Sequence, residues 1–379
     1  MRRRGKRDKA RFHDARRQRA PKGFTLGETI VTLVIVVLLV AAFVPMVRTL
    51  GSGGLRTVSL KNLVVLGEAQ ACYAADWHER QFSMAPKDLG TVNGNCFTYV
   101  SSVVCPNQAL LGWSVSGAMW GYFIGSGLCV SFPGNCSNLM VYRPISFGGS
   151  EPGFGCFRIP SFRGFQEYVG SKFYEREWYS ELDSVTWSVA STYFPAPDQF
   201  TSSGGTIAFP AYCTSPAALY NPGVFRRPSL GGFQNPDADF DDSYDAPSQA
   251  QCLYPDLKTR MVEHSWLVNP PAATNPAWSE PEPYYFNQGI ASKPGCLFFD
   301  GSIAEMTMTQ AVADDASMLK STNGIDGLWS RDTPFGADGY FGAQAFDDTR
   351  NSFHILTTDG ITGRDFLRRG RNGRQGGQP

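Results

Sequence analysis

The stretch KGFTLGETIVTLVIVVLLVAAFVPMV, residues 22–47, decides the fold that we predict for this chain. One carboxylate, Glu28, stands just ahead of Ile30–Val47, a run of 18 residues without a charge. As a helix that rises about 1.5 Å per residue, the run would extend roughly 27 Å, close to the roughly 30 Å of a bilayer's hydrocarbon core. A carboxylate at the mouth of such a run is costly and is usually retained for a function.

The charges ahead of the run are strongly asymmetric. Residues 1–23 hold eleven Lys or Arg and only two acidic residues, Asp8 and Asp14. A basic segment before an apolar helix keeps the N-terminus in the cytoplasm. The sequence therefore predicts a single-pass protein of the inner membrane, with the rest of the chain on the exported, periplasmic side.

Four other interpretations of the apolar run fit the sequence less well. A secretory signal would be cleaved near Val40–Ala42, but that site lies inside the run and leaves Glu28 unexplained. A plain uncleaved anchor also leaves Glu28 unexplained. A twin-arginine signal would need a different context around Arg16 and Arg17, and a buried soluble helix does not fit the basic leader.

The N-terminal motif resembles that of type IV pilins and type II secretion pseudopilins. Those proteins share a basic leader that ends in Gly, then Phe-Thr-Leu-x-Glu and an apolar helix, which here are Gly23, Phe24–Glu28 and the run after it. Pro45 matches a proline that many members carry. The resemblance implies that a prepilin peptidase cleaves between Gly23 and Phe24 and methylates Phe24. It also implies that Glu28 attracts the terminal amine of a neighbouring subunit during assembly.

Composition limits the partners of the remaining chain. Without the leader, 23 basic and 32 acidic residues remain, a net charge of −9, which argues against nucleic acid as a partner.

The chain has nine cysteines, all after the apolar run. On an oxidising exported side several of them would form disulfides, but nine is odd and the connectivity stays open. No Cys-x-x-Cys is present, which disfavours a zinc knuckle. The cysteines are Cys72, Cys96, Cys105, Cys129, Cys136, Cys156, Cys213, Cys252 and Cys296.

The predicted fold class is α+β and pilin-like, with a long N-terminal hydrophobic helix packed on a mostly antiparallel, β-rich head with long loops. Gly51–Gly54 and Pro45 predict a kink or an interruption of the helix. Beyond them an apolar stripe at helical spacing predicts a stalk: Leu63, Leu66, Ala69, Tyr73 and Trp77. The expected parts are a cleaved leader (1–23), an assembly half-helix (24–47), a hinge and stalk (48–82), a head (83–363) and a disordered basic tail (364–379).

Within the head, short runs of β-type residues predict strands at Phe97–Val104, Leu128–Phe132, Ser184–Tyr193 and Thr206–Phe209. Short helices are predicted near Leu257–Trp266 and near Gln310–Leu319, the second ending at Asn323-Gly324.

Cys296–Met306 places apolar segments on both sides of Asp300-Gly301, which predicts a hairpin. This segment resembles the closing hairpin of the large prepilin-type processing-associated proteins. In that family a His precedes the Asp-Gly by roughly nine to eleven residues, whereas this chain has none between His264 and Asp300.

The acidic cluster around Asp237, Asp239 and Asp241 imitates the start of a calcium loop. Asp242 then stands where Gly is wanted, and Ser248 where the bidentate Glu should be. Two interpretations stay open: a calcium site and a solvated acidic loop.

No nucleophile elbow, phosphate-binding loop or dinucleotide motif is present, so we expect no enzyme and no cofactor beyond calcium. The expected function is that of a structural subunit, a minor one, of a type IV pilus or a type II secretion pseudopilus. The expected partners are prepilin peptidase, other pilin-like subunits and the inner membrane. The alternative is a membrane-anchored exported binding protein, for example for polysaccharide, that does not polymerise.

Overall fold

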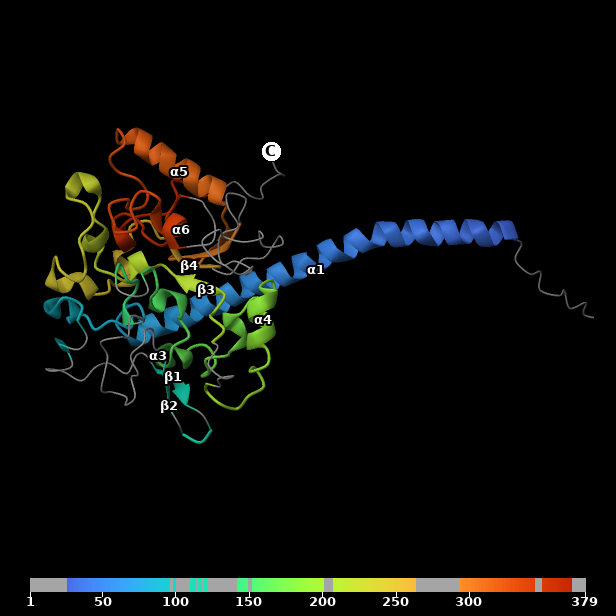
Figure 1. The fold of residues 1–379 in the computed structure, drawn as a ribbon, viewed down its shortest axis with the longest axis horizontal. Helices are drawn as coiled ribbons and strands as arrows, with labels where there is room; N and C mark the ends of the chain where they lie inside the picture. Colours follow the sequence, from blue (N-terminus) through green and yellow to red (C-terminus); the bar gives the residue numbers. More distant parts are fainter. Residues whose placement is uncertain are drawn as a thin grey trace, which may run out of the picture. The chain divides into compact units, whose positions relative to one another are not determined.

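The computed structural model describes residues 26–95, 98–99, 110–113, 115–117, 119–121, 142–148, 152–200, 207–263, 293–344 and 350–369. The chain separates into two compact units, residues 1–51 and 52–379. Helix α1, Leu26–Asp76, contributes to both (Figure 1). The remaining described elements belong to the second unit.

Helix α1 continues through Gly51–Gly54, so the predicted interruption at these residues is wrong. Glycine and proline each lower helix stability, but a helix tolerates them when the turns on either side are well formed. The glycine segment does coincide with the boundary between the two units, which falls after Gly51.

The second half of α1 packs into the core of the second unit. Leu63, Leu66 and Ala69 are buried, which confirms these positions of the predicted stripe. Trp77, the last residue of that stripe, follows the end of the helix and is 55% exposed. The helix packs closely on Leu297 at Gly67, where an added Cβ would lie 3.1 Å from Leu297 Cδ1.

The larger sheet has four short antiparallel strands in the order β3-β4-β5-β6. They are β3 (Tyr212–Thr214), β4 (Thr259–Glu263), β5 (Gly295–Phe298) and β6 (Ile303–Glu305). β5 and β6 form the predicted hairpin, with Gly301 in a left-handed conformation (φ +80°) that glycine accepts. A separate antiparallel pair consists of β1 (Leu110–Trp113) and β2 (Met119–Gly121).

Short helices and turns make up most of the other described structure. The α-helices are α3 (Arg163–Gln166), α4 (Ser184–Ala190), α5 (Met308–Ser321) and α6 (Gly339–Gln344). Single 3-10 turns occupy Leu89–Val92, Cys156–Arg158, Arg176–Trp178, Pro216–Ala218, Pro222–Phe225, Pro228–Leu230, Asp241–Tyr244, Gln249–Gln251 and Gly360–Thr362.

The predicted fold class is therefore wrong. In the part of the chain that the structure describes, no helix is long and apolar enough to cross a membrane. The described strands form only two small sheets, so the described part of the second unit is not β-rich. The lack of a membrane-length apolar helix among the described residues also contradicts the predicted single-pass location in the inner membrane.

Individual elements also differ from prediction. Ser184–Tyr193 begins as helix α4 instead of a strand, because the side chain of Asp183 accepts a hydrogen bond from the backbone N–H of Thr186 at 3.0 Å. Leu257–Trp266 contains strand β4 instead of a helix. Residues 207–209 have no regular structure. Helix α5 confirms the second predicted helix, whereas Leu128–Phe132 and most of Phe97–Val104 lie outside the described residues.

Candidate functional site

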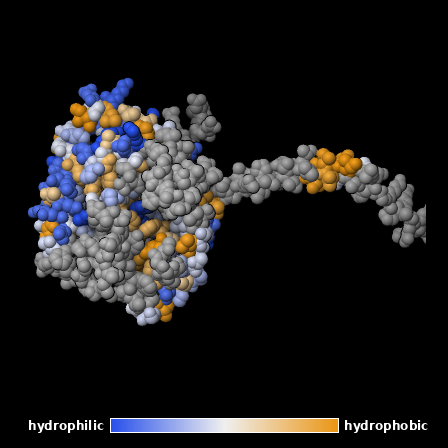
Figure 2. Space-filling model, in the orientation of Figure 1, coloured by the Kyte–Doolittle hydropathy of each residue, from blue (hydrophilic) through white to orange (hydrophobic). Residues whose placement is uncertain are grey.

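The first unit exposes an uninterrupted apolar surface on α1. Seven consecutive residues, 30–36, are exposed, and all but Thr32 are aliphatic. The exposed fractions of the six aliphatic residues run from 50% at Val34 to 65% at Leu33. Successive helical residues are about 100° apart, so seven of them point in every direction around the axis. We call residues 30–36 the apolar collar, and Figure 2 shows it as an orange segment of the helix.

The predicted processing site lies beside this collar in the sequence. Glu28 belongs to α1, two residues ahead of Ile30. Gly23 and Phe24 lie outside the described residues, so the predicted cleavage and methylation site stays a prediction. The described structure begins at Leu26.

Buried polar contacts hold the second half of α1 in the second unit. The Ser59 hydroxyl lies 2.8 Å from the Tyr212 hydroxyl, and the Asn62 amide donates to the Tyr179 carbonyl at 3.0 Å. Nearby, Arg56 forms an ion pair with Glu305 of β6 and donates to the Lys293 carbonyl at 2.7 Å. These contacts fix both the rotation and the register of the helix against the sheet.

Glu263, at the end of β4, is the central acceptor of this attachment. Its carboxylate accepts hydrogen bonds from the Ser59 hydroxyl and, at 2.8 Å, from the Gly295 N–H. Burial raises the pKa of Glu263, and the two hydrogen bonds oppose that rise. Tyr212 lies against the same group, and burial raises the pKa of its hydroxyl, which therefore stays protonated.

Two of the three predicted calcium ligands, Asp237 and Asp239, have separate partners. Asp237 forms an ion pair with Arg143 at 3.3 Å and accepts a hydrogen bond from Tyr244. Asp239 accepts from the backbone N–H of Asn235, and Asp241 begins a 3-10 turn. No group of three or more His, Cys, Asp or Glu side chains within the described ranges could hold a metal ion. The structure thus does not bring the three carboxylates together.

A buried polar network that the sequence did not reveal joins β3 and β4 to the C-terminal segment. Lys258 forms an ion pair with Asp365 at 3.0 Å and donates to the hydroxyls of Ser215 and Thr357. The Thr259 hydroxyl lies 2.7 Å from His354 Nδ1, and His354 Nε2 lies 3.5 Å from Cys213 Sγ. No motif spacing connects these residues, and their proximity arises only from the tertiary fold.

The electrostatics of this network favour a structural role. Burial, together with the nearby positive charge of Lys258, lowers the pKa of His354 to about 3. Burial also raises the pKa of the Cys213 thiol. Both groups are therefore neutral at physiological pH, so Cys213 is not an activated thiolate. Asp365 keeps a lowered pKa because Lys258 and several hydroxyl and amide donors stabilise its charge against the effect of burial.

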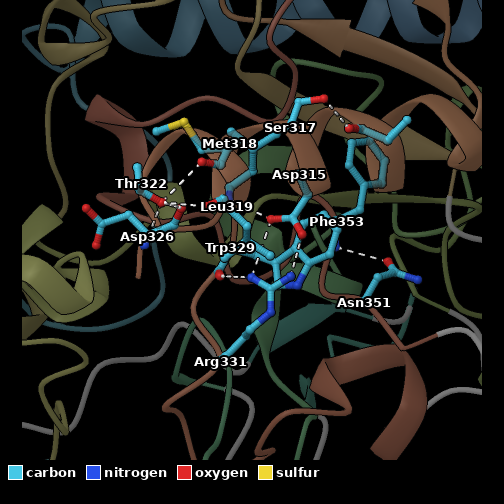
Figure 3. A network of polar contacts seen from close by, with 12 residues as sticks. Asp315, Ser317, Met318, Leu319, Thr322, Asp326, Trp329, Arg331, Asn351 and Phe353 are labelled. Carbon is cyan, nitrogen blue, oxygen red and sulfur yellow. Dashed lines mark hydrogen bonds and ion pairs between the residues drawn. The ribbon is translucent and has the colours of Figure 1, made fainter. Parts of the chain in front are cut away.

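A second network anchors the end of α5 (Figure 3). Asp315 accepts a hydrogen bond from the Leu328 N–H at 2.8 Å and forms an ion pair with Arg331. The Arg331 guanidinium lies 5.0 Å from the ring centre of Trp329. The Thr322 hydroxyl, just after the helix, donates to the Asp326 carbonyl at 2.8 Å. These contacts stiffen the second unit on the side of α5.

All five cysteines within the described part of the chain are free: Cys72, Cys156, Cys213, Cys252 and Cys296. Cys72 is exposed, whereas Cys156, Cys213 and Cys296 are buried. The other four cysteines, Cys96, Cys105, Cys129 and Cys136, lie outside the described residues.

Comparisons with family models, with curated proteins and with solved structures find no match to this chain. The chemistry and geometry of the described residues therefore carry the functional argument.

Proposed function

We propose that this protein is a pilin-like structural subunit, a minor one, whose α1 packs against α1 of sister subunits in a type IV pilus or a type II secretion pseudopilus. The observation that carries the proposal is the apolar collar, which surrounds the helix axis and whose aliphatic side chains are 50–65% exposed among the residues that the structure describes. A contiguous exposed apolar surface marks a site of interaction.

The collar has enough area to drive association. Each of its six aliphatic side chains is about half exposed, and full burial of such a side chain is worth about 1.5–3 kcal/mol. Covering the collar would therefore contribute on the order of 5 kcal/mol per subunit before the entropic cost of association. Because the surface points in all directions, it suits a helix with neighbours on every side, as at the centre of a fibre.

The firm attachment of the second half of α1 supports the same proposal. A subunit of a fibre must transmit load from its assembly helix to its outer unit. The buried contacts of Ser59 and Asn62 and the ion pair of Arg56 supply such a connection.

Processing completes the proposal. Prepilin peptidase would cleave between Gly23 and Phe24 and methylate Phe24, and Glu28 would then pair with the terminal amine of a neighbouring subunit. The intact mass of the protein from its native cells tests this step. The expected mature chain begins at Phe24 with one added methyl group, whereas a chain that begins at Met1 contradicts it.

Assembly is tested by a charge placed in the collar. Val34→Lys would put an ammonium into the proposed helix interface, so we expect the variant to be lost from sheared fibres while its total cellular amount is unchanged. Val64→Lys is the matched control, because Val64 is similarly exposed (45%) but lies in the second unit. Equal incorporation of both variants would refute the proposed role of the collar.

A further inference from the structure

A small cavity in the second unit is lined by a buried cation, Arg260, that has no counter-charge among the described residues. The cavity has a volume of about 20 Å³ and lies where α1, α3 and β4 meet. Its lining includes Gln70 and Tyr73 of α1, Phe165 of α3, and Arg260 of β4. None of these four lining residues takes part in the polar contacts, described above, that attach α1 to the second unit.

Arg260 is only 7% exposed. Its guanidinium donates to Gln249 Oε1 at 3.2 Å and to the Gln70 carbonyl at 3.4 Å, and it lies 5.5 Å from the ring centre of Phe299. Its Nε–H is buried with no hydrogen-bond partner. Among the described residues no carboxylate lies within ion-pair distance of it.

An uncompensated buried charge is costly, and proteins usually pair it. Burial lowers the pKa of Arg260 to about 9, which is the direction expected when no nearby anion offsets the loss of hydration. Other buried cations in the same unit have such an anion, as Lys258 has Asp365. The cavity beside Arg260 is therefore the place where a counter-ion would remove this cost.

The size and the lining of the cavity limit which ligands it can bind. By the same measure of volume a single water needs about 10–15 Å³, so the cavity accepts one particle slightly larger than water. Gln70 and Thr214 add polar groups to its wall, and the rest is largely apolar, from Phe82, Phe165 and Leu219. No acidic side chain lines it.

We propose that this cavity binds one small monovalent anion of about the size of chloride, held by the guanidinium of Arg260 and covered by Gln70 and Tyr73 of α1. Because two residues of α1 form part of its wall, bound anion would strengthen the attachment of the helix. Larger anions such as sulfate or gluconate would not fit.

The test uses the full chain and compares thermal unfolding in about 100 mM sodium chloride with unfolding in sodium gluconate of equal ionic strength. For a Kd of about 1 mM we expect chloride to raise the Tm by about 2 °C or more. Arg260→Met should abolish this difference. Arg350→Met, which removes an exposed guanidinium, should retain it.

Three results would overturn the proposal: equal Tm values in the two salts, an unchanged chloride effect in Arg260→Met, or stabilisation by acetate but not by chloride. The last would indicate a carboxylate ligand instead. If Arg260→Met does not fold, chloride NMR of the wild-type protein provides the second measurement. Line broadening that bromide competes away and gluconate does not supports the site, and its absence refutes it.

Discussion

At the scale of single residues, Lys258 and Asp365 form an ion pair that is buried in the second unit. Both side chains are at most 1% exposed, and the carboxylate also accepts hydrogen bonds from Thr259 and Thr357. A buried ion pair often adds little net stability, but the removal of one partner leaves the other charge buried without compensation.

We therefore expect Lys258→Met to lower the free energy of unfolding by about 3–5 kcal/mol, because Asp365 would keep its charge without a partner. Denaturant unfolding measures the change. Arg350→Met removes one partner of the exposed pair with Asp338 and should change stability by less than about 0.5 kcal/mol. If the two variants lose equal stability, the buried pair does not have the assigned role.

The lowered pKa of His354 predicts that the free energy of unfolding depends on pH in the acidic range. Its pKa is about 3 in the folded protein and about 6.5 when unfolded, so below pH 6.5 the unfolded chain binds a proton that the folded chain does not. The contribution of His354 is fully present above pH 6.5 and is lost progressively as the pH falls towards 3. His354→Gln should flatten the stability profile in this window, whereas a change at the exposed His78 should not. An identical slope in wild type and His354→Gln would contradict this account.

At the scale of elements, the sequence predicted helix α5 and the β5–β6 hairpin correctly, because capping and turn residues determine these elements locally. Thr307 caps α5, and Asn323 and Gly324 after its end take positive φ angles, which stop the helix as predicted. The Asp300-Gly301 turn likewise fixed the hairpin. The predicted helix near Leu257–Trp266 was wrong because tertiary contacts determine the structure there. Thr259–Glu263 forms a strand that pairs with β3 and β5.

The apolar stripe of α1 also gives a stability prediction. Leu66 is fully buried, whereas Val64, two residues earlier, is 45% exposed. Leu66→Ala should therefore lower the free energy of unfolding by about 2–5 kcal/mol, mainly through the cavity that it leaves. Val64→Ala is the control on the same helix and should cost well under about 1 kcal/mol. Similar losses in thermal or denaturant unfolding would mean that this face of α1 is not the packed one.

At the scale of the whole molecule, the sequence indicated the apolar surface but not how the second unit holds its helix. The run of aliphatic residues in 30–36 was evident from the sequence, and these side chains are exposed in the part of the chain that the structure describes. By contrast, Cys213, Thr259, His354 and Asp365 are widely spaced in the sequence and meet only in the folded unit. The uncompensated Arg260 could not be foreseen either, because burial is not visible from sequence.

The account depends most on contact between collars of sister subunits, and site-specific photo-crosslinking tests this contact directly. A photoreactive amino acid would replace Val34 in protein assembled in its native cells, with the same substitution at Val64 as the control. We predict a ladder of crosslinked multimers from position 34, with the crosslinked peptides mapping to residues 26–47 of the partner copy, and no ladder from position 64. Only monomer at position 34, or crosslinks solely to unrelated proteins, would contradict the proposal.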